Sequence, residues 1–262
     1  MKRLIFSICL LLTSGLAYSA VIGKTVDYKV DDVILKGYLA VDDSIKGERP
    51  GILVVHEWWG HNDYARKRAD MLAELGYTAF AVDMYGEGKN TEHPKEAGEW
   101  SSQISKNVEL GKTRFLAALD LLKQQETVDA EEIAAIGYCF GGGVVLTMAR
   151  LGVDLKGVAS FHGSLSTDQP AKAGAVKAKV LVFHGEADAL VTPEIVEAFK
   201  KEMQTAKVDL EFVNYPDVKH SFTNPNADKI AKEYDLPIAY DEQADKDSWA
   251  KLQAFFKRIF TK

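Results

Sequence analysis

The sequence predicts an α/β fold with a mainly parallel sheet, because short apolar runs typical of buried strands alternate along the chain with longer segments of helical periodicity. The chain has 262 residues, and 47% of them are hydrophobic, which is enough to bury a large core. No internal repeat, low-complexity tract or Pro/Gly-rich linker divides it. We therefore expect a single domain over residues 20–262, preceded by a leader over residues 1–19.

The leader has the pattern of a secretory signal peptide. Lys2 and Arg3 form a positive start, residues 4–12 form an apolar run, and Ala17-Tyr18-Ser19 places small residues before a cleavage site. The apolar run is shorter than the roughly 20 residues that cross a bilayer, so we expect no stable membrane anchor. The alternative interpretation is a frayed N-terminal anchor. Cleavage predicts a periplasmic protein or, as second choice, a secreted one.

Cleavage would also change the cysteine count. The chain has two cysteines, and Cys9 would leave with the leader, so the mature chain would retain Cys139 alone. In an oxidising compartment a cysteine normally finds a partner. Cys139 would have none within its own chain, so it is either an inert buried thiol or a reactive one.

The elements follow in order along the mature chain. Residues 26–30 and 33–39 have the pattern of an opening hairpin. Strands, most of them continuously apolar as in strands buried on both faces, are expected at 51–55, 78–82, 133–136, 157–161, 180–183 and 208–213. Helices are expected near 63–76, 101–125, 141–151, 193–206 and 244–260. Longer polar connections near 84–98 and 162–178 are expected to form the rim of a site.

The sharpest local motif is Gly137-Tyr138-Cys139-Phe140-Gly141-Gly142-Gly143, which lies between a predicted buried strand and a predicted helix. It has the form of the G-x-S-x-G nucleophile elbow, with cysteine in place of serine. Flanking glycines allow the sharp turn that projects the central residue at a helix N-terminus. There the helix dipole favours a thiolate, and the amide of Phe140 can face a developing oxyanion. The alternative is a buried structural cysteine.

An elbow of this kind requires an acid and then a histidine further along the chain. Asp188 follows the predicted strand at 180–183, and His220 follows the one at 208–213. Ligands bind at the carboxyl ends of the strands in open α/β sheets, so both side chains are expected at the site. His220 would act as general base and acid, and Asp188 would hold its tautomer and stabilise the imidazolium. Taken singly, each has an ordinary alternative as a capping or solvated loop residue.

The other histidines predict no metal centre. His56, His162 and His184 each end an apolar run, but no two histidines have a close ligand spacing such as H-x-x-x-H. His61 and His93 have the pattern of ordinary loop residues. We expect neither a metal nor a cofactor.

Five segments together resemble the dienelactone hydrolase family of α/β-hydrolases. These are His56-Glu57-Trp58-Trp59-Gly60, Asp83-Met84-Tyr85, the elbow, Gly185-Glu186-Ala187-Asp188 and His220-Ser221-Phe222. The resemblance implies an α/β-hydrolase fold, a mainly parallel sheet flanked by helices in a three-layer sandwich. It implies Cys139 as nucleophile, His220 as base and Asp188 as acid, with the amides of Phe140 and Trp58 as the oxyanion hole.

The resemblance also implies a role for Glu57. In the family this glutamate interacts with the resting cysteine, and its movement on substrate binding helps to generate the thiolate. A carboxylate beside a thiol disfavours the thiolate, so Glu57 would keep the nucleophile unreactive until a substrate binds. Aromatic side chains at Trp58, Trp59, Tyr85, Phe140 and Phe222 are expected to line the pocket, with ordinary core packing as the alternative for some of them.

The chain departs from the family pattern at two positions. Members that cleave dienelactones hold the substrate carboxylate with two arginines, and here those positions correspond to Gly86 and Asn224. Without a guanidinium there is little to select a carboxylate. The net charge of −6, which becomes two units more negative on cleavage, does not attract dianions either. We therefore predict a poor dienelactone hydrolase that prefers a neutral or mostly apolar ester or lactone.

The sequence thus predicts an exported ester or lactone hydrolase that works through an acyl-enzyme on a small-molecule substrate. Two other classes compete with it: a catalytically silent binding protein that kept the fold, and a redox-responsive thiol protein, for which the chain has no resolving cysteine. The acidic charge and the lack of a dense basic run argue against nucleic acid as a partner. A monomer is the favoured oligomeric state, although the sequence does not determine it.

Overall fold

The computed structural model describes residues 21–260, and the predicted signal peptide with Cys9 lies outside this range. The strands are β1 (Val21–Val30), β2 (Val33–Asp42), β3 (Arg49–Val55), β4 (Thr78–Val82), β5 (Val128–Tyr138), β6 (Gly157–Phe161), β7 (Lys179–Gly185) and β8 (Leu210–Tyr215). The helices are α1 (Asp63–Glu74), α2 (Pro94–Lys106), α3 (Val108–Lys123), α4 (Phe140–Arg150), α5 (Pro193–Thr205), α6 (Ala227–Tyr234) and α7 (Glu242–Ile259).

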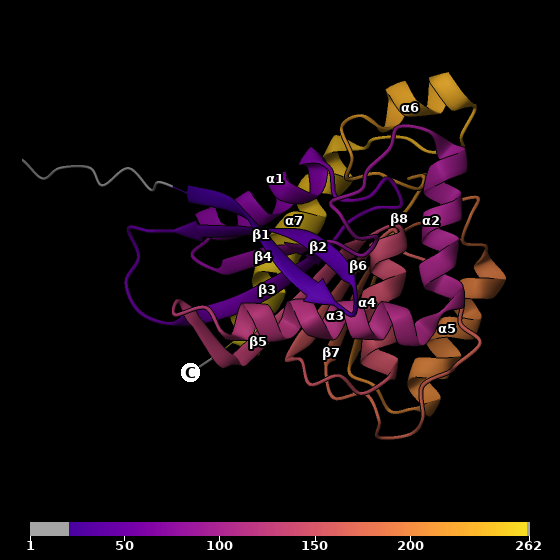
Figure 1. The fold of residues 1–262 in the computed structure, drawn as a ribbon. Coiled ribbons are helices and arrows are strands. Elements are labelled where there is room, and N and C mark those ends of the chain that lie inside the picture. The colour runs from indigo at the N-terminus through magenta and orange to yellow at the C-terminus, as the bar shows by residue number, and fades with distance from the viewer. Residues whose placement is uncertain (1–20, 261–262) are drawn as a thin grey trace, which may run out of the picture.

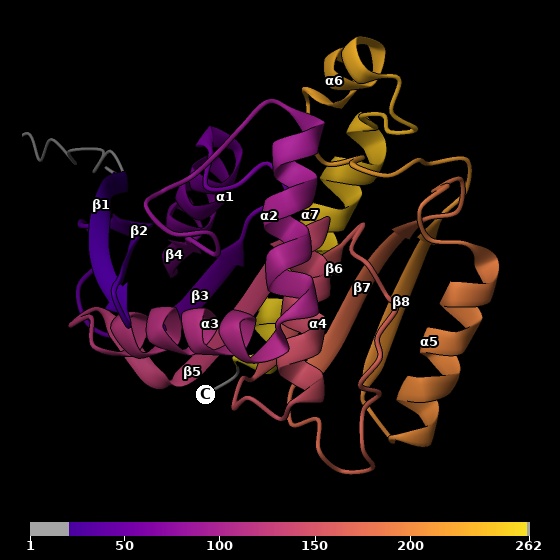
Figure 2. The same cartoon turned by 45° about the vertical axis from the view of Figure 1, so that its right-hand side comes forward.

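All eight strands form one sheet in the order β1-β2-β4-β3-β5-β6-β7-β8. The hairpin β1–β2 and its junction with β4 are antiparallel, and every pairing from β4 to β8 is parallel. Parallel strands need crossover connections, which here place helices on both faces of the sheet (Figures 1 and 2). The predicted three-layer α/β sandwich is confirmed.

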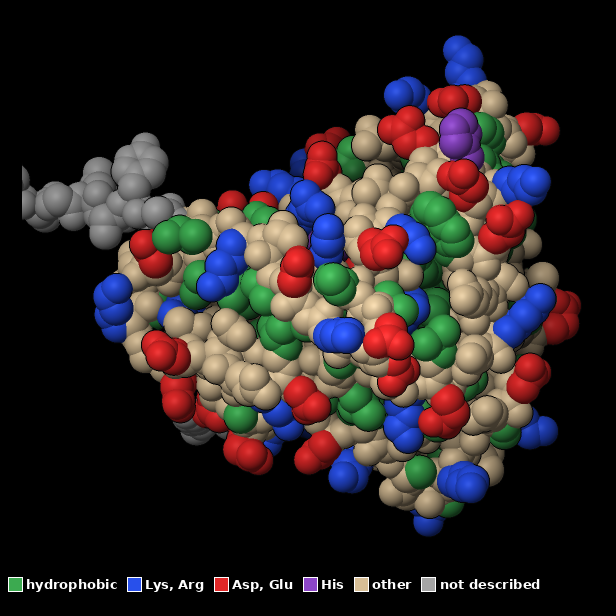
Figure 3. Space-filling model, viewed as in Figure 1, with side chains coloured by type: hydrophobic (Ala, Val, Ile, Leu, Met, Phe, Trp, Pro, Cys, Tyr) green, Lys and Arg blue, Asp and Glu red, His purple; other side chains and the backbone are tan. Residues whose placement is uncertain are grey.

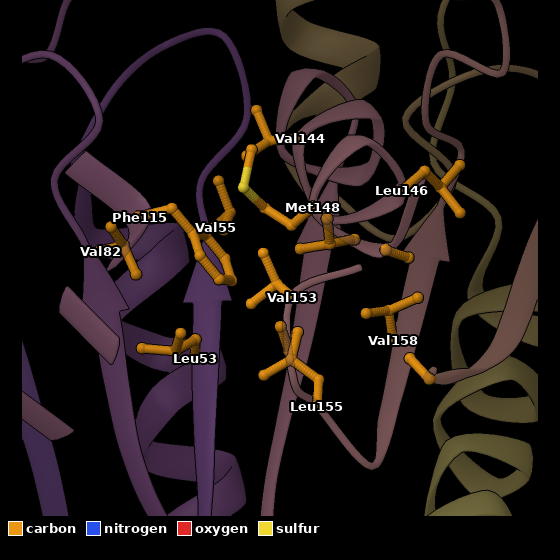
Figure 4. Packing of buried hydrophobic residues seen from close by; sticks show 14 of the residues in the cluster. Leu53, Val55, Val82, Phe115, Val144, Leu146, Met148, Val153, Leu155 and Val158 are labelled. Atoms are coloured by element: carbon orange, nitrogen blue, oxygen red, sulfur yellow. The ribbon is translucent and has the colours of Figure 1, made fainter. Parts of the chain in front are cut away.

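The two faces of the sheet carry separate cores, because successive strand residues point to opposite sides. Leu53 and Val55 of β3 pack with side chains of α3, α4 and α5, and part of this core is shown in Figure 4. Ile52 and Val54 of the same strand pack with side chains of α1 and α7. Both faces of the central strands are therefore buried, which explains the continuous apolar runs in the sequence.

Two buried ion pairs connect the helices that cover the sheet. Arg68 of α1 donates to Asp245 of α7 over 2.7 Å, and Arg150 of α4 donates to Glu202 of α5 over 2.8 Å. Both arginine side chains are almost fully buried, so each charge depends on its partner. On the face shown in Figure 3, acidic and basic side chains are interspersed rather than gathered into a patch of one sign.

The element predictions were wrong in three places. The single helix expected near 101–125 is two helices, because Asn107 ends α2 and its side chain accepts the Leu110 N–H at the start of α3. Helix α2 also begins inside the connection expected near 84–98, with Pro94 in its first turn. Helix α6 was not predicted: it is only eight residues long, and Ala227 is its one buried residue. No helix within residues 21–260 has both the length and the apolar character needed to cross a bilayer.

Candidate active site

The elbow lies where β5 ends and α4 begins. Cys139 caps the N-terminus of α4 with φ 52° and ψ −115°, a backbone conformation that side chains with a Cβ rarely adopt. The turn is tight: a Cβ on Gly137 would lie 2.1 Å from Gly141 O, and a Cβ on Gly141 would lie 2.3 Å from Val55 O. These contacts account for the glycines on both sides of Cys139. The thiol is free and half-buried at the positive end of the α4 dipole.

Asp188 and His220 lie beyond the carboxyl ends of β7 and β8, and they are joined by a hydrogen bond. His220 Nδ1 lies 2.7 Å from Asp188 Oδ2, and both side chains are buried. Burial acts to lower the pKa of His220, but neighbouring Cys139 and the bond to Asp188 raise it to about 10. Burial acts to raise the pKa of Asp188, and the hydrogen bond from His220 outweighs it and leaves that pKa below its ordinary value. His220 Nε2 is buried and makes no hydrogen bond to an oxygen or nitrogen atom among residues 21–260, and an interaction with the Cys139 thiol is among the causes that raise the pKa of the ring.

Cys139 and His220 open into one cavity of about 380 Å³. Its lining consists of Trp58, Ser101, Ser105, Cys139, Phe140, Ser164, Leu190, Val191, His220, Ser221, Leu236, Pro237 and Ile238. Within the described chain, this set contains no lysine, arginine, aspartate or glutamate. Apart from Cys139 and His220, a group bound here would meet apolar side chains and hydroxyls.

The two residues expected to supply the oxyanion hole both line this cavity. Phe140 is the first residue of α4, so its N–H is one of the helix-terminal amides that have no partner within the helix. Trp58 follows β3, and its carbonyl accepts the Tyr85 hydroxyl over 3.0 Å. That bond fixes the peptide beside the cavity. The oxyanion role of both amides remains a prediction.

Glu57 is buried next to Ser221, which lines the cavity, and its carboxylate is held by the loop that carries His220. Asn224 Nδ2 donates to Oε2 over 2.6 Å, and Ser221 Oγ donates to Oε1 over 3.5 Å. Burial raises the pKa of Glu57 to about 7, although Asn224, His220, Arg68 and Ser221 act to lower it. The side-chain contacts that hold Glu57 therefore come from the loop that carries His220.

The raised pKa predicts a stability loss at neutral pH. Relative to an ordinary value of 4.5, the carboxyl contributes stability below pH 4.5 that is lost as the pH rises through about 7. The side chain introduced by Glu57→Gln cannot ionise. The free energy of unfolding of the variant minus that of wild type should therefore be about 3 kcal/mol more favourable to the variant at about pH 8 than at pH 4.5. Urea unfolding at the two pH values measures it. The exposed control Glu74→Gln should show no such change, and a constant difference for Glu57→Gln would contradict ionisation near pH 7.

Three of the aromatic side chains expected in the pocket do not line it. Phe222 is fully buried and packs edge-on against the rings of His162 and Tyr215. Tyr85 lies behind Phe140, with ring centroids 5.5 Å apart, and Trp59 faces a separate, polar cavity. The expectation was wrong for Trp59, Tyr85 and Phe222: Tyr85 and Phe222 pack in the two cores, and Trp59 lines the separate cavity. Trp58 and Phe140 are the aromatics of the cavity.

Gly86 and Asn224, which stand where the family has arginines, both have structural roles. Gly86 has φ 91°, and its N–H donates to Asp83 Oδ1 over 2.8 Å in the turn after β4. A Cβ there would lie 2.7 Å from Val33 Cγ1, so a larger residue does not fit this turn. Asn224 is buried against Glu57 and does not line the cavity. Neither position offers a cation to a substrate.

His56 and His61 lie in the interior, whereas His93 is exposed. His56 accepts the Met84 N–H at Nε2, joining the ends of β3 and β4. His61 was expected to be an ordinary loop residue, but its side chain is fully buried. Burial lowers the pKa of His61 to about 4, so it is neutral. His93, expected to be an ordinary loop residue, is the N-cap residue of α2, although its side chain makes no capping hydrogen bond. Within residues 21–260 no group of His, Cys, Asp and Glu side chains could hold a metal ion.

Several cavity residues had no signal in the sequence. Ser101 and Ser105 come from α2, and Leu236, Pro237 and Ile238 come from the segment after α6. The Ala239 N–H donates to His220 O over 3.1 Å, which folds this segment back over the base's loop. Leu190 could have been suspected, because it lies two residues after Asp188 in a polar loop. Its side chain is 55% exposed at the mouth of the cavity.

The chain is similar in sequence and in fold to known proteins. A model described as the dienelactone hydrolase family matches residues 35–260. Protein usf of Aquifex pyrophilus is 29% identical over 91% of this chain and 100% of its own length. A putative carboxymethylenebutenolidase of Aquifex aeolicus is 25% identical over 90% of this chain and 98% of its own. A solved dienelactone hydrolase-like promiscuous phosphotriesterase from metagenomic libraries superposes with a TM-score of 0.87 at 34% identity, over 92% of this chain and 100% of its own.

Proposed function

Because the chain belongs to the dienelactone hydrolase family, we propose that it hydrolyses neutral carboxylic esters or lactones through Cys139, His220 and Asp188. The observation that carries the choice of substrate is the cavity beside Cys139, which no lysine, arginine, aspartate or glutamate lines among the described residues. A carboxylate moved from water into such a cavity would lose its hydration and meet no cation other than His220, which is already paired with Asp188. A neutral acyl group would gain apolar contacts instead.

The proposed reaction begins at the thiol. His220 Nε2 takes the proton of Cys139, and Sγ attacks the carbonyl carbon of the ester. The carbonyl oxygen becomes an oxyanion that receives the amide protons of Phe140 and Trp58. The tetrahedral intermediate then collapses, the alkoxide leaves with the proton from His220, and a thioester remains on Cys139. His220 next activates water, which releases the acid and the free thiol.

Asp188 supports both proton transfers. Its hydrogen bond to Nδ1 keeps the proton of neutral His220 on that nitrogen, so Nε2 faces the thiol as the base. When His220 becomes an imidazolium, the buried carboxylate 2.7 Å away stabilises the charge.

A matched pair of substrates tests the proposal. We expect kcat/KM for 4-nitrophenyl butyrate to exceed that for mono-4-nitrophenyl succinate by about 10-fold or more, since the two acyl groups differ chiefly in a terminal carboxylate. Leu190→Lys places a cation at the mouth of the cavity. That variant should improve the succinate several-fold and leave the butyrate within about twofold. A wild-type preference for the succinate would contradict the assignment of a neutral substrate.

Phosphotriester hydrolysis is a second candidate activity. It is favoured by the 34% identity to the solved relative that is described as a promiscuous phosphotriesterase. Phosphotriesters are also uncharged, so the same cavity suits them. Including a diethyl aryl phosphate in the substrate panel tests this activity, and loss of its turnover in Cys139→Ala would place the reaction at the same thiol.

A further inference from the structure

His162 lies directly behind the nucleophile, and the proposed reaction does not use it. It follows β6, its side chain is buried, and its backbone has φ 41°, in the left-handed region. Both ring nitrogens are hydrogen-bonded. Nδ1 accepts the backbone N–H of Cys139 over 3.2 Å, and Nε2 lies 2.7 Å from Thr223 Oγ1.

These partners determine the tautomer of His162. Nδ1 accepts a backbone N–H, so it carries no proton, and the ring proton lies on Nε2 and is donated to Thr223. Burial and the nearby charge of His220 hold the pKa of His162 well below its usual range, so the ring is neutral. A neutral ring in a single tautomer is suited to act as a fixed spacer.

The ring connects two segments whose separation matters for catalysis. One is the backbone of Cys139, which also donates its N–H to Phe161 O over 3.0 Å. The other is the loop after β8, where Thr223 lies three residues beyond His220. The His162 and His220 rings pack edge to face with centroids 5.2 Å apart, so a shift of one ring displaces the other.

The Thr223 end of this connection is itself anchored. Thr223 Oγ1 lies 2.6 Å from the Tyr64 hydroxyl, and Thr223 O accepts Arg68 Nη2 over 2.7 Å. Arg68 also donates to Asp245, so the loop of His220 is fastened to α1 and α7. The nucleophile's end is anchored in the sheet, because the His162 N–H donates to Phe183 O over 2.8 Å.

We propose that His162 is a positioning residue that sets the distance between Cys139 Sγ and His220 Nε2 by bracing the backbone of the elbow against Thr223. This inference rests on the proposed function, since it assigns those two atoms to one proton transfer. A displacement of about 1 Å between reacting groups can lower a rate about 100-fold, so a brace of this kind acts on kcat rather than on KM.

Three variants test the connection that His162 makes through its two hydrogen bonds, one from the Cys139 N–H and one to Thr223. In His162→Asn the side-chain oxygen can replace Nδ1 as acceptor for Cys139, but the side chain is too short to reach Thr223. Thr223→Val removes the hydroxyl at nearly constant volume. His162→Asn combined with Thr223→Val should be little worse than His162→Asn alone, because the same link is already broken. His184→Asn is the matched control, a buried histidine at the same edge of the sheet with no bond to the elbow.

Two readouts are needed. We expect His162→Asn and Thr223→Val to lower kcat about 10- to 100-fold with KM within about threefold. The rate at which iodoacetamide alkylates Cys139 at neutral pH should fall at least about fivefold, because the thiolate is favoured by a close imidazolium. Alkylation needs no substrate, so it tests the brace even if every ester assay fails, in which case only the proposed function would be lost. Folded variants with kcat and alkylation rates within about twofold of wild type would overturn the inference, whatever their thermal stability.

Discussion

Replacing Cys139 with alanine is expected to lower kcat/KM for neutral esters by at least about 10⁴-fold, because the acyl-enzyme cannot form without the sulfur. The fold should persist, since the side chain is half-buried at the N-terminus of α4 and the substitution leaves the backbone of the elbow intact. Alkylation of the wild-type thiol should abolish turnover in parallel. The measurement is steady-state hydrolysis, with thermal unfolding to verify folding.

The outcome discriminates the competing functions. Hydrolysis that survives both the alanine variant and alkylation would refute Cys139 as the nucleophile. An accessible thiol in a protein that turns over no ester, lactone or phosphotriester would favour a binding protein that kept the fold. Stable oxidation of Cys139 to a sulfenic acid, with a function independent of His220, would favour the redox alternative.

The second large effect is expected for Asp188→Asn, which should lower kcat about 10⁴-fold with little change in structure. An asparagine oxygen can still accept the Leu190 N–H that now bonds to Asp188 Oδ1 over 2.8 Å. The lost charge no longer stabilises the imidazolium, and the amide no longer enforces the tautomer that leaves Nε2 as base. Glu186→Gln, on the same loop but exposed, should stay within about twofold of wild type.

The same variant should change the pH dependence of stability. His220 has a pKa of about 10 in the folded protein against an ordinary value of 6.5. The raised value contributes stability that is fully present below pH 6.5 and is lost as the pH rises through 10. Asp188→Asn removes one cause of this rise, so its thermal unfolding temperature should fall less steeply between pH 6.5 and 10 than that of wild type. A parallel decline would show that Asp188 does not determine the ionisation of His220.

Most strands were predictable because both of their faces are buried. The runs at 78–82 and 157–161 match β4 and β6 to the residue, and every position in both strands is buried. The break between α2 and α3 was not predictable from periodicity, because the helical spacing continues through Asn107. Only its backbone, with φ −118° and ψ 79°, reveals that one residue ends the first helix and caps the second.

The residues that line the cavity were harder to predict than the three candidate catalytic residues. Cys139, Asp188 and His220 were found from their places after apolar runs, and the structure brings all three to one edge of the sheet; their catalytic roles remain predictions that the variants above test. Aromatic character alone misled at Phe222, since a large apolar ring after a strand packs equally well in the core.

The α/β architecture and the residues at the ends of its parallel strands could be predicted from the order of amino acids, because both follow from local patterns of burial and turn formation. The surroundings of those residues could not, because they depend on the tertiary structure. Leu190 and Ile238 meet at one cavity, and Asn224 reaches a carboxylate 167 positions away in the chain. Such contacts depend on how distant loops converge over the sheet, and no local pattern encodes that. The same holds for His162, whose neighbours Cys139 and Thr223 turn an apparently ordinary strand-end histidine into the proposed brace.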